Sequence, residues 1–342
     1  ATVVHIKTRS LMINGVISFA TRGLNDHGSP HALEHLVFMG SDKYPYKGVL
    51  DHMAHKSFSE GTNAWTAQDH TAYTWNCAGE EGNERLFPVF LDHVLRPKIT
   101  KASSWSEVYH VKDDGDEGGV VFAEMQAREK TIGDRIFSAL KRQMYSSESG
   151  YYYNTGGTLD GLRKVTHTEL VDFHKEHYRL DNMTVTFVGD VNIDPLLQII
   201  DSYNTQQFVN KPPIWQVPSG IVSSTEQHVS HVTFPSQNLE LGAVIYAWRG
   251  PSWENFAEKT AYRCYGRYLT EDASSPLIKT IVEKGICSDI QFSIMDFSDT
   301  TLFFYFDNVH LSEINKLHKL FLDTIRQPIT MDDMRNMLQL FQ

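Results

Sequence analysis

The sequence predicts an α+β protein made of two tandem, homologous sandwich domains, each a mostly antiparallel sheet with helices packed on one face. Strand-like and helix-like segments alternate without the strict order of βαβ units. The Pro-rich segment NKPPIWQVPSG is typical of a linker. Beyond it the chain begins again, because GAVIYAWRG at 242–250 matches GVISFATRG at 15–23 in four residues at the same offset. We expect a first domain at 1–209, the linker at 210–220 and a second domain at 221–342.

Hydrophobic periodicity and turn residues predict the elements of the first domain. Ser29 as N-cap and Pro30 at the first helical position mark the start of one helix, and Gly40 follows its end. The predicted elements, in chain order, are a strand at 15–21, helices at 30–39 and 49–56, hairpin strands at 61–66 and 71–79, helices at 84–95, 120–145 and 167–178, and a strand at 182–189. The chain stops in a helical pattern, so we expect the second domain to be cut short.

Composition excludes several classes of protein. The net charge of −11, with both signs mixed along the chain, argues against nucleic acid as a partner. No apolar run approaches the roughly 20 residues of a membrane span. Three widely spaced cysteines indicate a reducing compartment, so we expect a cytoplasmic protein. Because the chain starts at Ala1, we expect either that the true N-terminus is missing or that a targeting segment has been removed, and the mitochondrial matrix is the alternative location.

The segment HALEH, from His31 to His35, carries the strongest chemical signal. Residues four apart lie on one helical face, so His31 and His35 can direct their imidazoles at a common point, with Glu34 beside them. Two imidazoles at this spacing suit Zn²⁺. Glu34 can then act as the general base toward water activated by the metal. The alternative, a solvated helical face, fits poorly with the apolar residues that flank the segment.

A catalytic zinc needs a third protein ligand, and DEGGVVFAEMQARE supplies the best candidate. Glu124 follows the apolar run Val120, Val121 and Phe122, which predicts burial, and a buried carboxylate needs a partner. Glu117 lies two helical turns earlier and would share the same face if the helix extends that far. The alternative is a helix with ordinary surface glutamates.

These residues resemble the inverted-zincin metallopeptidases of the pitrilysin and insulysin type, whose signature is HxxEH. The matching segments are HALEH with EHLVFMGSDKYP, GTNAWTAQDHTAY, GVVxxEM around Glu124 and YRLDNMTVTFVGDV, and they are most similar to the presequence-protease branch. The resemblance implies one Zn²⁺ per chain held by His31, His35 and Glu124, with Glu34 as catalytic base. Glu117 would be an accessory catalytic glutamate. It therefore implies a zinc endopeptidase that hydrolyses unfolded peptides.

The same resemblance implies a substrate site on the strand with Asn63, Ala64 and Trp65, where a peptide binds as an added β-strand. An ordinary hairpin is the alternative. Members of this branch also carry a second homologous half that closes a chamber around the substrate, so this chain is expected to be the N-terminal half. An inactive subunit that binds peptides is the alternative function.

Other histidine pairs and the second domain give weaker signals. His52 with His55, and His174 with His177, have metal-compatible spacing but lack a carboxylate of their own, so we interpret them as surface or second-layer residues. At the offset of the repeat, His31, Glu34 and His35 correspond to Glu258, Ala261 and Tyr262. The second domain is therefore expected to be non-catalytic.

Overall fold

The computed structural model describes residues 1–203, 228–333 and 335, and the predicted linker at 210–220 lies outside them. The chain divides into two compact units, each treated by itself below. The first unit comprises 1–129 and 145–220, and the second comprises 130–144 and 221–342. Both combine helices with a sheet, as expected of an α+β fold. The segment 130–144, assigned by sequence to the first domain, thus belongs to the second unit.

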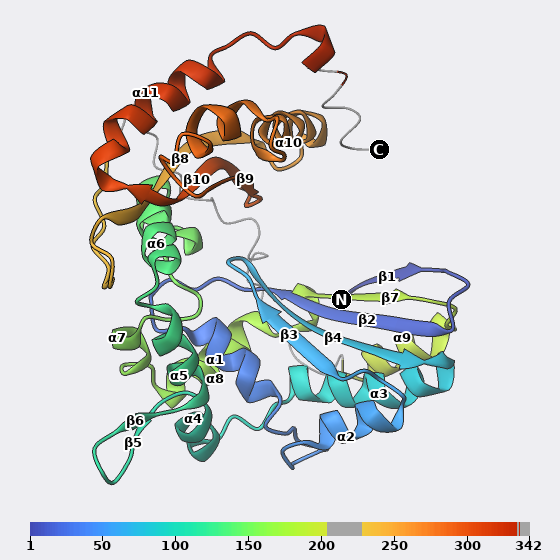
Figure 1. Ribbon diagram of the computed structural model, residues 1–342. Helices are drawn as coiled ribbons and strands as arrows, with labels where there is room; N and C mark the ends of the chain where they lie inside the picture. The colour runs from blue at the N-terminus through green and yellow to red at the C-terminus, as the bar shows by residue number, and fades with distance from the viewer. Residues whose placement is uncertain (204–227, 334, 336–342) are drawn as a thin grey trace. The chain divides into compact units, whose positions relative to one another are not determined.

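The first unit contains a five-stranded sheet with the strand order β1-β7-β2-β4-β3 (Figure 1). Only the β1–β7 pair is parallel within this sheet, and its other neighbours run antiparallel. The strands are β1 (Thr2–Ile6), β2 (Met12–Ala20), β3 (Thr62–Thr66), β4 (His70–Ala78) and β7 (Met183–Val188). The predicted strand at 15–21, the hairpin and the strand at 182–189 are therefore confirmed.

The helices of the first unit lie on one face of this sheet (Figure 1). They are α1 (Ser29–Val37), α2 (Val49–Lys56), α3 (Gly79–Leu95), α4 (Lys101–Glu107), α5 (Val120–Arg128), α7 (Leu159–Leu162), α8 (His167–His177) and α9 (Ile193–Ser202). A small hairpin of β5 (His110–Val111) and β6 (Glu117–Gly118), with the 3₁₀ turns η1 (Gly150–Tyr152) and η2 (Leu180–Asn182), completes the unit.

The core between sheet and helices follows from the sequence pattern. Alternate residues of β2, such as Ile13 and Ile17, are fully buried, as the period of two demands for a strand with one covered face. They pack against apolar residues of the helices, among them Leu33 of α1 and Phe90 of α3. This packing holds α1, and with it the HALEH segment, against the sheet.

The second unit contains a three-stranded antiparallel sheet with the strand order β8-β10-β9. Its elements are α6 (Ile132–Met144), β8 (Leu241–Ser252), α10 (Phe256–Thr270), the π-helical turn η4 (Ile278–Val282), β9 (Asp289–Met295), β10 (Asp299–His310), the 3₁₀ turn η5 (Leu311–Glu313) and α11 (Ile314–Ile325). Phe304 and Phe306 of β10 pack with Phe321 of α11 in its core. The alternate residues Phe303 and Tyr305 contact Phe137 of α6.

Two predictions about helices are wrong in detail. The helix expected at 120–145 breaks between α5 and α6, and its two parts belong to different units. The N-cap of α1 is Gly28 rather than Ser29. Gly28 has φ 73°, and a side chain there would collide with the backbone of Gly156, so this position requires glycine.

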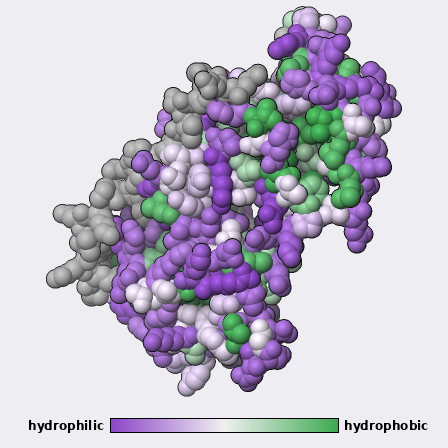
Figure 2. Space-filling view, turned by 90° about the vertical axis from the view of Figure 1, so that its left-hand side faces the viewer, coloured by the Kyte–Doolittle hydropathy of each residue, from purple (hydrophilic) through white to green (hydrophobic). Residues whose placement is uncertain are grey.

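The described part of the chain contains no helix that is both long and apolar enough to cross a membrane. The face in Figure 2 is mostly hydrophilic, although hydrophobic side chains gather in one group on it. Exposed aromatic side chains of the second unit include Trp248, Trp253 and Phe256.

Candidate metal centre

Helix α1 presents the two histidines on its partly exposed face. Ala32, Leu33, Leu36 and Val37 are fully buried and fix the rotation of the helix about its axis. His31, Glu34 and His35 are half-buried on the opposite side. The imidazole rings of His31 and His35 lie 4.9 Å apart between centroids and are nearly perpendicular. The i, i+4 spacing therefore produces the convergence that the sequence predicts.

Glu124 of α5 completes a three-residue cluster with these histidines. Its Oε2 lies 3.5 Å from Nε2 of His31 and 3.7 Å from Nε2 of His35. The ligand atoms of the three residues lie within 4.8 Å of one another, and this is the metal-type cluster found among the described residues. Ligands held at 2.0–2.1 Å around a tetrahedral zinc are about 3.4 Å apart, so the donor set and its spacing fit this metal.

The expectation that Glu124 is buried is wrong. Val121, Phe122 and Met125 are buried, but the Glu124 side chain is 45% exposed. The apolar run anchors α5, and the glutamate projects from the other side of the helix. Its partners are therefore the two imidazoles, and burial alone does not explain its position.

The environment of the histidines favours the neutral form that binds metals. Burial lowers the pKa of His31, the neighbouring His35 lowers it further, and the charge of Glu124 opposes both. Burial likewise lowers the pKa of His35, against the charges of Glu124 and Glu107. Neutral imidazoles at physiological pH present free lone pairs, as a metal site requires.

The carboxylate of Glu34 is held by a residue that the sequence did not indicate. The hydroxyl of Thr66, the last residue of β3, donates a hydrogen bond of 2.5 Å to its Oε2. Burial raises the pKa of Glu34, the Thr66 hydrogen bond lowers it, and the charge of Glu124 raises it. A general base with a raised pKa is better matched to work near neutral pH.

Glu107 is a second residue that sequence reasoning missed. It ends α4, lies close enough to influence His35, and is paired with Lys47 at 2.8 Å. Its side chain is only 10% exposed, whereas that of Lys47 is 66% exposed. The burial of this acid beside α1 is a feature of the tertiary structure, and no local sequence motif predicts it.

Glu117 stands outside the cluster of ligand atoms. It lies on β6, because Gly119, with φ 120°, ends the strand and α5 begins only at Val120. The helix therefore does not extend to Glu117, contrary to the condition set from sequence. Arg163 holds its carboxylate through two hydrogen bonds of 2.6 and 2.8 Å, and the Tyr109 hydroxyl donates a third of 2.9 Å. The hydrogen bonds from Arg163 lower the pKa of Glu117 to about 2.

Strand β3, which carries Asn63, Ala64 and Trp65, is an edge strand of the five-stranded sheet. The Ala67 N–H donates to the His70 carbonyl at the hairpin turn. In an antiparallel pair the inward-facing residues alternate, so the backbone N–H and C=O groups of Trp65 and Asn63 also point toward β4. Those of Ala64 and Thr66 face the outer edge instead. The Ala64 N–H is covered by its neighbour, because it donates to Oδ1 of Asn63 at 2.9 Å.

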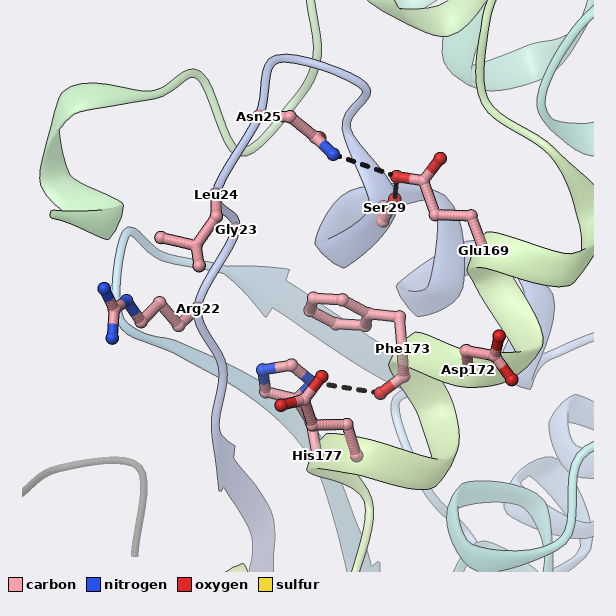
Figure 3. A pocket seen from close by; sticks show the side chains of 10 residues that line it. Arg22, Gly23, Leu24, Asn25, Ser29, Glu169, Asp172, Phe173 and His177 are labelled. Atoms are coloured by element: carbon pink, nitrogen blue, oxygen red, sulfur yellow. Dashed lines mark hydrogen bonds between the residues drawn. The ribbon is translucent and has the colours of Figure 1, made fainter. Parts of the chain in front are cut away.

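A cavity of about 390 Å³ lies beside the loop that leads into α1 (Figure 3). Glu169 of α8 accepts hydrogen bonds there from Asn25 and Ser29, at 3.2 and 2.8 Å. It also contacts Nδ1 of His27 at 2.9 Å. These bonds fix the loop, and therefore the start of α1, to α8.

The histidine pair on α8, His174 and His177, contacts backbone carbonyls. Nε2 of His174 lies 2.9 Å from the Val94 oxygen, and Nδ1 of His177 lies 3.0 Å from the Phe173 oxygen. Burial lowers the pKa of His174 to about 4. These contacts are those of structural residues on α8.

Family models match nearly the whole chain. The model described as "Insulinase (Peptidase family M16)" matches residues 23–146, and that described as "Peptidase M16 inactive domain" matches residues 164–338. The first range contains HALEH and Glu124, and the second contains the elements of the repeat.

Relatives and solved structures agree with these matches. An uncharacterized protein of Caenorhabditis elegans is 35% identical over 322 residues, 92% of this chain and 32% of the relative. The mitochondrial presequence protease of Gibberella zeae is 31% identical over 303 residues, 80% of this chain and 28% of that protein. A protease from Helicobacter pylori has the same fold, with a TM-score of 0.73 at 17% identity, covering 98% of this chain and 80% of that one.

The chain thus spans about a third of the length of the curated relatives it matches. Within that span, the matched ranges and the fold agree with each other along both units. The chain belongs to peptidase family M16.

Proposed function

We propose that this chain is the catalytic part of a zinc-dependent endopeptidase that hydrolyses unfolded peptides. The observation that carries the proposal is the convergence of two imidazole nitrogens and one carboxylate oxygen, with Glu34 on the same helix face. His31, His35 and Glu124 would hold the ion. When bound, zinc would supply Lewis acidity that polarises the scissile carbonyl and makes water easier to deprotonate.

Glu34 performs the proton transfers in this proposal. Its carboxylate removes a proton from the attacking water, whose oxygen forms a bond to the carbonyl carbon. The C–N bond then breaks, and Glu34 returns the proton to the leaving amine. The products are a carboxylic acid and an amine, and the base ends the cycle unprotonated.

The edge strand supports peptides as the substrate class. The outward backbone groups of Thr66 and the outward carbonyl of Ala64 can pair with an extended peptide, which adds a strand to the sheet. Backbone pairing tolerates many sequences but requires an extended segment, so a folded protein is a poor substrate. Asn63, Ala64 and Trp65 would line this position. Glu117, held by Arg163, would act only as an outer support for α5.

Two further proposals concern the whole protein. Because the relatives are about three times as long, a second homologous half, in the same chain or in a partner, would close a chamber around the peptide. Because several relatives are named mitochondrial presequence proteases, the mitochondrial matrix is the proposed location, with the cytoplasm as the alternative.

Hydrolysis of a long quenched-fluorescence peptide by the parent and by Glu34→Gln tests the proposal. We expect the parent to cut and the variant to retain zinc without cutting. Zinc binding and peptide binding by both proteins without hydrolysis by either would contradict it, and would favour the alternative of a binding subunit.

A further inference from the structure

We infer that Thr66 is a positioning residue that couples the bound peptide to the catalytic base; this inference rests on the proposed function. Thr66 is the residue of β3 whose side chain reaches Glu34, at 2.5 Å. Its own backbone faces the outer edge of the sheet, where a peptide would pair. One residue therefore contacts the base through its hydroxyl and the peptide through its main chain.

The direction of the hydrogen bond follows from its chemistry. An ionised carboxylate only accepts, so the Thr66 hydroxyl is the donor and Oε2 of Glu34 is the acceptor. Among the described residues, no hydrogen bond reaches the other oxygen, Oε1. The hydroxyl therefore fixes one oxygen of the base and leaves the other free to take a proton.

Positioning matters because glutamate has three rotatable side-chain bonds. Without the Thr66 hydroxyl, the carboxylate can leave its productive orientation although α1 stays in place. The alternation of side chains along β3 favours the role, since residues 62, 64 and 66 are half-buried on the helix side while 63 and 65 are exposed. Position 66 is thus where the strand meets the base.

The first experiment measures kcat and KM for peptide hydrolysis by Thr66→Val and Thr66→Ser. Valine keeps the shape and removes the hydroxyl, so we expect kcat to fall about 10- to 100-fold, less than the about 10²–10⁴-fold lost when the base itself is removed, with KM nearly unchanged. Serine restores the donor and should recover most of kcat. As a matched control, Thr330→Val removes a 2.6 Å hydrogen bond to Asp333 in the second unit and should leave kcat unchanged.

The second experiment does not depend on turnover. Atomic absorption measures zinc content, and calorimetry measures the affinity of a phosphinic peptide, whose tetrahedral phosphorus mimics the adduct of water and the amide. Thr66→Val should weaken binding about tenfold when Glu34 is present but about twofold or less when Glu34 is already glutamine, because the effect acts through the base. Zinc content should be equal in all variants.

The outcomes separate the two proposals. If the parent cuts or binds the phosphinic peptide but Thr66→Val behaves like the parent, the positioning role fails and the peptidase proposal stands. An equal loss of affinity in both Glu34 backgrounds also overturns the role, because Thr66 would then act directly on the peptide. If the zinc-loaded parent neither cuts nor binds, both proposals fail.

Discussion

The helices α1 and α10 occupy corresponding places in the two units. Each helix follows one copy of the sequence repeat, 15–23 before α1 and 242–250 before α10. The strand order β2-β4-β3 of the first unit recurs as β8-β10-β9 in the second. On α1 these positions hold His31, Glu34 and His35, and the two histidines face Glu124. On α10 Glu258 bonds to Asn255, the N-cap residue, at 2.7 Å.

This difference teaches that the fold alone creates no metal centre. Lys259 of α10 is buried and paired with Asp296 at 2.8 Å, which stabilises the helix without leaving ligand atoms together. The same framework therefore carries a buried ion pair in one unit and a cluster of metal-type ligand atoms in the other. The change lies in a few side chains on one helical turn.

The largest expected effect comes from removing a ligand. We expect His31→Ala or His35→Ala to lose both bound zinc and peptide hydrolysis, because two remaining ligands do not hold a catalytic zinc. Zinc content by atomic absorption and hydrolysis of the quenched peptide measure this. Tyr262→Ala, at the position of α10 that corresponds to His35, is the matched control and should retain both. Full zinc content in His35→Ala would show that His35 is not a ligand, and that α1 and α10 do not differ in this respect.

Removing the base should separate catalysis from metal binding. Glu34→Gln keeps the size of the side chain but cannot accept the proton, so we expect kcat to fall by about 10²–10⁴ while zinc content stays at the parent level. Chelation followed by readdition of zinc should restore hydrolysis in the parent only. Equal rates for parent and variant would refute the role of Glu34.

Alanine substitutions at two corresponding glycines of the sequence repeat, Gly15 and Gly242, should change the stability by different amounts. A Cβ at Gly15 would lie 2.0 Å from the Trp75 ring, which is buried in the core. At the corresponding Gly242 it would lie 2.9 Å from the end of the Leu311 side chain, with nothing else nearer than 4.0 Å. We expect Gly15→Ala to lower the free energy of unfolding by about 1–3 kcal/mol. Gly242→Ala should change it by about 0.5 kcal/mol.

Urea unfolding followed by tryptophan fluorescence measures both glycine variants. Equal losses would mean that Leu311 cannot move aside, so that the second unit is packed as rigidly at this strand as the first.

The smallest effect concerns Glu117 and acid stability. Its pKa is held at about 2, below the ordinary 4.5, so it contributes stability that is present above pH 4.5 and is lost as the pH falls toward 2. Arg163→Met should raise this pKa toward 4.5 and remove that contribution. NMR titration of the Glu117 carboxyl in both proteins measures the shift. An unchanged pKa would show that the Tyr109 hydrogen bond suffices.

Sequence reasoning predicted the parts of this molecule that depend on local patterns. The period of strands and helices placed the first unit's central strand, hairpin and most helices, and the HALEH spacing placed His31 and His35 on one face. The sequence did not predict the exposure of Glu124. An apolar run indicates that a helix is anchored in the core, but it does not indicate the direction of each polar side chain on that helix.

Other features depend on contacts between distant residues. The hydrogen bond from Thr66 to Glu34 joins residues of a strand and a helix that meet only in the folded sheet. Likewise, the position of Glu117 depends on the positive φ of Gly119, which ends the short strand before α5. The break between α5 and α6 places the two helices in different units, which the continuous helical pattern of the sequence does not show.

Helix α6 carries a consequence for how this chain can be divided. Its residues, 130–144, lie in the sequence between two parts of the first unit, yet Phe137 packs on Phe303 and Tyr305 of the second. No single cut separates the two units. A fragment ending at 209 would keep α6 without the aromatic partners of Phe137, and one starting at 221 would lack that cover. Each unit is thus discontinuous in the sequence, and no single segment of the chain contains all of one unit without part of the other.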